Sequence, residues 1–187
     1  IVHSSKESLV RNLADVIIKG KKIWLLDEVI QVLIGYKTAP ILIEEICETI
    51  YHPVSIERSE QAIESIGRIL SDNNQGEILE KVAVHMNTRN QYSRITKSFA
   101  QGVVQSSHPE FALNLTEIMI KSRRDDAIGD ISAGIVSSNH SELVIKLCQL
   151  LIDYEKPRYL EVLSHNTANY SINSAVDIKN IAYRVLE

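Results

Sequence analysis

The stretch GVVQSSHPEFALNLTEIMI, residues 102–120, is followed along the chain by GIVSSNHSELVIKLCQLLI, residues 134–152. The two align without a gap at a shift of 32, and seven of their nineteen positions are identical. Six of the other twelve positions exchange one apolar residue for another. A chain that repeats itself at a period of this length is expected to fold as an array of similar units.

Each copy contains a helix-start signal in which a serine or asparagine precedes a glutamate by three residues. Ser107-His-Pro-Glu110 and Asn139-His-Ser-Glu142 are predicted capping boxes, whose first side chain accepts from a free backbone N–H. The same pattern occurs at 74–77 and, with aspartate, at 174–177. The four acidic residues are 33, 32 and 35 positions apart, so the repeat extends beyond the two quoted stretches.

Apolar residues at helical spacing stand on both sides of these starts. At the same shift of 32 residues, Leu115 aligns with Leu147 after the helix start, and Phe99 aligns with Ile131 before it. Each unit is therefore predicted to be two antiparallel helices joined by a short turn. The predicted helices cover residues 5–19, 22–36, 39–51, 56–71, 75–86, 91–106, 108–121, 126–138, 140–153, 157–168 and 172–186.

One helix pair cannot bury its apolar side alone, so neighbouring pairs are expected to stack. We predict an all-α fold, an α-solenoid of about five antiparallel helix pairs plus a leading helix. It forms one helical repeat domain over residues 1–187, with a compact helical bundle as the alternative. The chain begins at Ile1 rather than Met, which leaves open that it is a fragment of a longer protein.

The period and the helix starts over residues 22–186 resemble those of HEAT-like and armadillo-like α-solenoids with short helical-hairpin repeats. This resemblance implies an extended array of stacked hairpins. Such arrays usually present a long, shallow surface to proteins or peptides. The expected function is therefore a non-enzymatic protein–protein interaction scaffold, with no catalytic residues and no cofactor.

The partner is expected to bind along the second helices of successive pairs, opposite their apolar stripes. The residues predicted to contact a protein or peptide partner are Glu44, Glu48, Lys81, Asn114, Glu117, Lys121, Lys146 and Gln149.

Composition narrows the class of protein. Hydrophobic residues make up 44% and charged residues 24%, which is typical of a globular chain and not of a disordered one. The net charge of −4 argues against general attraction to nucleic acid. No apolar run is long enough to cross a membrane. Cys47 and Cys148 are predicted to be buried, reduced thiols, so a cytoplasmic, reducing location is expected.

Two alternative functions remain open at this stage. Glu45, Glu48 and His52 share one helix face, as the ligands of a metal protein or enzyme could. His108 and His140 occupy equivalent positions but are interpreted as turn residues, because stacked helices lie roughly 10 Å apart and could not share one ion.

A nucleic-acid-binding repeat is the other alternative. It would use the basic residues at two predicted helix ends, where cations also have an ordinary structural role.

The N-terminal half carries an acidic face that we interpret as solvated. Trp24 and Tyr36 flank an apolar helix and are predicted to be packing residues. The basic clusters are Lys19, Lys21 and Lys22, and Lys121, Arg123 and Arg124; the acidic face contains Glu57, Glu60 and Glu64.

Overall fold

A computed structural model describes residues 2–51, 56–87, 93–137, 140–156 and 159–160. Every regular element in these ranges is an α-helix and none is a strand, which confirms the all-α prediction. The predicted hairpin at 157–168 and 172–186 lies almost wholly outside the described residues. The helices are α1 (Val2–Lys19), α2 (Trp24–Ile34), α3 (Ala39–Tyr51), α4 (Ile56–Asp72), α5 (Gly76–Asn87), α6 (Ser93–Val104), α7 (Phe111–Lys121), α8 (Asp125–Ser137) and α9 (Ser141–Asp153).

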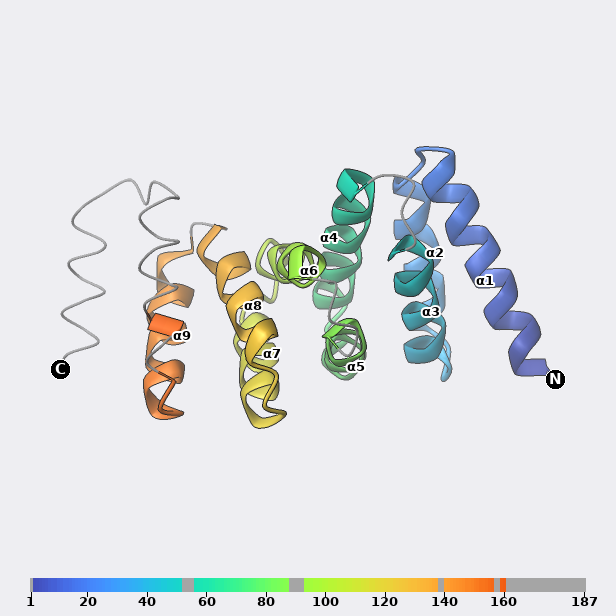
Figure 1. Ribbon diagram of the computed structural model, residues 1–187. Helices are drawn as coiled ribbons and strands as arrows, with labels where there is room; N and C mark the ends of the chain where they lie inside the picture. Colours follow the sequence, from blue (N-terminus) through green and yellow to red (C-terminus); the bar gives the residue numbers. More distant parts are fainter. Residues whose placement is uncertain (1, 52–55, 88–92, 138–139, 157–158, 161–187) are drawn as a thin grey trace.

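The helices follow one another in a row, with α1 and α9 at opposite ends (Figure 1). Each packs extensively against the helix two positions along the chain. The odd-numbered helices α1, α3, α5, α7 and α9 contact one another in sequence, and so do α2, α4, α6 and α8. We call these two sets the odd layer and the even layer. Consecutive helices also contact each other, so the two layers enclose the apolar core between them.

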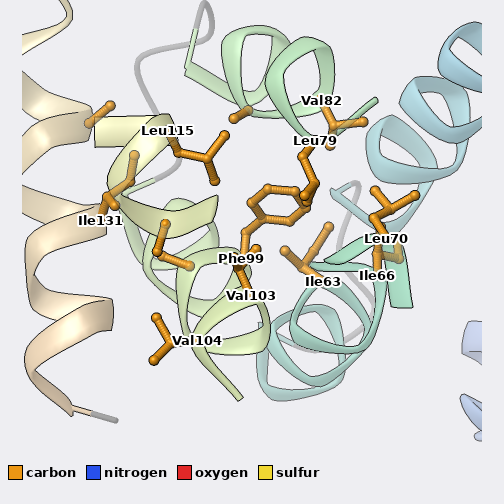
Figure 2. Packing of buried hydrophobic residues seen from close by; sticks show 14 of the residues in the cluster. Ile63, Ile66, Leu70, Leu79, Val82, Phe99, Val103, Val104, Leu115 and Ile131 are labelled. Atoms are coloured by element: carbon orange, nitrogen blue, oxygen red, sulfur yellow. The ribbon is translucent and has the colours of Figure 1, made fainter. Parts of the chain in front are cut away.

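The core in the middle of the row is continuous from α4 to α8 (Figure 2). Phe99 of α6 is 1% exposed and lies among apolar side chains from both layers. Two pairs of positions matched by the predicted repeat have the same burial, since Leu115 and Leu147 are both buried, as are Phe99 and Ile131. A third matched pair differs, because Phe111 is half-buried and Leu143 is buried.

Three glycines allow the even-layer helices to approach closely. A Cβ atom built on Gly102 of α6 would lie 1.9 Å from the carbonyl oxygen of Glu64 on α4. A Cβ on Gly67 of α4 would lie 2.4 Å from the carbonyl oxygen of Phe99, and one on Gly134 of α8 would lie 2.9 Å from that of Lys97. Because a side-chain carbon cannot occupy these positions, only glycine permits such backbone contact. The three glycines are 35 and 32 positions apart, which is the repeat period.

Four helices end in the same kind of turn. The residue two positions beyond α1, α4, α7 and α9 has a positive φ of 58°, 55°, 56° and 52°, at Lys21, Asn74, Arg123 and Glu155 respectively. In each turn the next backbone N–H donates to the carbonyl five residues earlier, as Arg124 does to Met119 at 2.9 Å. This bonding pattern satisfies the free carbonyls at the helix end.

The helix starts differ from the prediction. The prediction that Ser107 caps α7 is wrong, because its hydroxyl donates to the Asp72 carboxylate on α4 at 2.9 Å. The helix begins later, and Glu110 precedes it without a side-chain capping bond. Asn74 terminates α4 in the left-handed conformation. Ser107 therefore links two neighbouring units, and Asn74 ends the helix before the one that it was predicted to cap. Asn139 and the box at 174–177 lie outside the described residues.

Candidate interaction surface

All eight residues predicted to contact a partner lie on consecutive helices of the odd layer. Five of them are exposed, namely Lys81, Asn114, Lys121, Lys146 and Gln149. Glu44 and Glu117 are half-buried. The side chain of Glu48, on α3, is outside the described residues. The helices involved are α3, α5, α7 and α9, so the prediction placed these positions on one layer.

Two of the predicted residues, Glu117 and Lys121, take part in a polar cluster between α7 and the end of α9. Lys121 and Glu117 form an ion pair at 2.7 Å, and the Tyr154 hydroxyl donates to the same carboxylate at 2.5 Å. The hydrogen bonds from Lys121 and Tyr154 lower the pKa of Glu117, while the bond to Glu117 raises the pKa of Lys121 and of Tyr154. These groups stabilise one another, so Glu117 and Lys121 are less free to meet a partner than the prediction assumed.

A similar electrostatic link joins α3 and α5. Lys81 forms an ion pair with Glu77 one turn earlier, at 2.7 Å. The hydrogen bond to Glu77 raises the pKa of Lys81, and the charge of Glu44 on α3 adds to that effect. Both ends of the odd layer thus carry charges that interact between successive helices.

Of the remaining predicted residues, Lys146 borders a hollow between the starts of α7 and α9. Lys146 lines this hollow, which has a volume of about 300 Å³, together with His140, Glu110 and Glu142. Gln149, farther along α9, donates to Asp153 at 2.8 Å on its own helix. Asn114 is exposed on α7. The hollow is small, open and mixed in charge, and its two carboxylates face one lysine.

The metal alternative gains no support from the described residues. Glu45 pairs with Arg11 of α1, and His52 lies outside the described ranges. The His108 ring nitrogen lies 3.2 Å from the Glu110 carboxylate, and the ring contacts Phe111 edge-on. In the parts of the chain that the structure describes, no three histidine, cysteine or acidic residues are grouped as a metal ion needs.

The two basic clusters are exposed, but they lie at separate helix ends. One follows α1 and the other follows α7. Between them in the odd layer, α3 has no basic residue in its last turn. Nucleic-acid-binding repeats are expected to carry a basic stripe along successive units. The spacing of these clusters does not favour that alternative over a protein partner.

The sequence prediction missed a surface at the N-terminal end of the row. Trp24 and Tyr36, predicted to pack in the core, are 64% and 59% exposed, so that prediction is wrong. Leu9, Leu13 and Val16 of α1 are also exposed. Their spacing of four and three residues places them on one face of α1. With the buried residues, they make the apolar part of the helix surface wider than one packed face requires, and this could have been recognised in the sequence. We call these five residues together with Val32 the N-terminal apolar surface.

Both cysteines agree with their predicted environment. Cys47 and Cys148 are buried and are not joined in a disulfide. Burial raises the pKa of the Cys148 thiol, which keeps it protonated and unreactive at neutral pH. Among the described helices, none has the length and hydropathy needed to cross a bilayer.

No protein-family model, curated protein or solved structure matches the chain. The functional inference therefore depends on the contacts and surfaces described above.

Proposed function

We propose that this chain is a non-enzymatic interaction scaffold, an α-solenoid of the HEAT-like or armadillo-like kind that binds a protein or peptide along its odd layer. The observation that carries the proposal is the order of the helix contacts. Each helix packs against the helix two positions along, in both layers. Repeated hairpins that stack in this way form elongated surfaces that suit extended or helical partners.

The exposed residues of α7 and α9 are the best candidates for partner contact. Asn114, Lys146 and Gln149 are exposed, and they lie on adjacent helices of one layer. The odd layer contains no exposed aromatic among these positions, so the affinity is expected to be modest and to depend on many polar contacts. The free, buried thiols of Cys47 and Cys148 fit a reducing compartment such as the cytoplasm.

Comparative capture from a cell extract tests this proposal. The intact chain and the triple variant Asn114→Ala, Lys146→Ala, Gln149→Ala are each immobilised, and the bound proteins are quantified. Partners of the odd layer should be depleted by about tenfold on the triple variant, since hot-spot losses are of that size. The matched control is a double variant of two exposed residues away from the odd layer, Gln61→Ala on α4 and Gln105→Ala directly after α6, and it should retain these partners. Equal recovery on all three proteins would show that the odd layer is not the binding surface.

A further inference from the structure

Exposed large apolar side chains are concentrated at one end of the molecule. Of the eight such residues in the described ranges, seven belong to α1, α2, the turn after α2 or the first turn of α3. The exception, Ile152 of α9, is the least exposed of them at 36%, whereas Leu9 and Val16 reach 67%. Isolated apolar residues are ordinary on a protein surface, but a group this concentrated marks an interaction site.

The order of the helices indicates what kind of element could cover this surface. In the even layer α4 lies between α2 and α6, and α6 lies between α4 and α8. Within the described residues α2 has an even-layer neighbour on one side only, which is α4. One further helix on its other side would contact α2 and α1 in the way that α2 contacts α4 and α3.

The charges around this surface indicate the chemistry of the occupant. Lys6, Lys21, Lys22 and Lys37 are exposed and form no ion pair within the described residues. Glu28 is the exposed acidic residue on α2. Lys19 is already paired with Asp15 at 2.6 Å. A second copy of this surface would bring lysines against lysines, whereas acidic residues on a different partner would complement them.

We infer that the N-terminal apolar surface binds an amphipathic helix of a partner protein, whose apolar stripe is flanked by acidic residues. The inference rests on the proposed scaffold function and adds a second site with a defined partner chemistry. The helix lies alongside α2 and α1 and continues the even layer. Its apolar residues cover Leu9, Leu13, Val16, Trp24 and Val32, and its carboxylates face the lysines around them.

A designed peptide provides a direct test. It has about three heptads, with leucine at the two core positions and glutamate beside them, and it carries a fluorescent label. Binding to the intact chain is measured by fluorescence anisotropy. We expect saturable binding that weakens several-fold between roughly 0.05 and 0.3 M salt, because the lysines are exposed and screened. A peptide of the same pattern with lysine in place of glutamate should bind at least about tenfold more weakly.

Variants of the protein locate the site. The pair Leu9→Ser and Val16→Ser should weaken binding of the glutamate peptide by about tenfold or more, and Lys21→Glu with Lys22→Glu by several-fold. Ile152→Ser is the matched control, since it removes an exposed aliphatic residue elsewhere, and it should bind as the intact chain does. Because all four substituted positions are exposed, the variants should keep their helical circular dichroism signal and unfolding midpoint.

Three results would overturn the inference. The first is equal binding of the two peptides, or equal binding by Leu9→Ser/Val16→Ser and the intact chain. The second is a dimer in light scattering that dissociates in that variant, which would make a second copy the occupant. The third is binding to vesicles containing phosphatidylserine, lost in the variant, in the absence of peptide binding. Failure of the scaffold proposal is recognised separately, because it is read from the odd-layer variant and not from these positions.

Discussion

The middle of the row and its N-terminal end are built from the same kind of amphipathic helix, yet they present opposite surfaces. In the middle, Phe99 and Leu115 are almost fully buried, and Gly102 brings two helix backbones into contact. At the N-terminal end, Leu9 and Trp24 are mostly exposed. The difference follows from the number of neighbours within the described residues, where α6 has a neighbour on both sides along its layer and α2 has one. Exposure at the end therefore reflects position in the row as much as composition.

The largest expected effect concerns the glycine contacts of the middle. Gly102→Ala places a carbon against the Glu64 carbonyl and forces α4 and α6 apart. We expect it to lower the free energy of unfolding by about 3 kcal/mol or more, as overpacking of rigid backbone does. The change in the free energy of unfolding is measured by urea denaturation, monitored by circular dichroism.

The control is Gly129→Ala, on α8, where an added Cβ meets no atom within 4 Å. Alanine should stabilise this helix by about 0.5–1 kcal/mol because of its higher helix propensity. If the two substitutions have the same effect, the close approach of the even helices does not contribute to stability.

The next prediction compares two leucines of the same size. Leu115→Ala leaves a cavity at a fully buried position and should lower the free energy of unfolding by about 2–5 kcal/mol. Leu13→Ala, at a position that is 44% exposed, should cost less than about 1 kcal/mol. Both are measured by denaturation of the isolated chain. A large cost at Leu13 would mean that the N-terminal apolar surface is already covered in solution.

The helix-ending turns should behave alike in both regions. Lys21 and Arg123 have φ values of 58° and 56°, which are unfavourable for residues with a Cβ atom. Replacing either with glycine should stabilise the protein by about 0.5–1 kcal/mol, after the greater entropy of unfolded glycine is subtracted. Arg124→Gly, one residue farther, is the control and should bring no gain. A gain at Arg123 without one at Lys21 would show that the N-terminal turn is less well formed.

The smallest effect concerns the polar contact between α7 and α9. Tyr154→Phe removes a hydrogen bond to Glu117 and should lower the free energy of unfolding slightly at neutral pH. The pKa of Glu117 is lowered by Lys121 and Tyr154, so this stabilisation is present above the ordinary carboxyl value of 4.5. It is lost as the pH falls through the lowered value in the folded protein. The difference between the two proteins should therefore shrink in acid, which urea titrations at a series of pH values would reveal.

The prediction of the helices succeeded because their signals are local and repeated. The spacing that links Leu115 to Leu147 correctly placed two equivalent buried positions. The helix starts were predicted less well. Ser107 has the right residue type and spacing for a cap, but its hydroxyl bonds to Asp72, which lies far away in sequence. Local spacing alone could not reveal that competing partner.

The candidate surfaces show the same limit. Asn114, Lys146 and Gln149 were predicted to be exposed on neighbouring helices, and they are. Glu117 satisfies the same periodicity, but Tyr154 from the next helix end binds it. Trp24 is a large aromatic of the kind that packs in cores, but it is 64% exposed, and within the described residues α2 has only one neighbour in its layer.

By itself, the sequence determined the type, number and approximate ends of the helices across the described residues, because hydrophobic periodicity and turn residues act within a few positions of the chain. Only the tertiary structure decided which apolar faces are covered, where Gly67, Gly102 and Gly134 meet other backbones, and that the Tyr154 hydroxyl binds the Glu117 carboxylate. Burial and pairing are properties of neighbours in space, and each depends on residues that lie 30 or more positions apart in the chain.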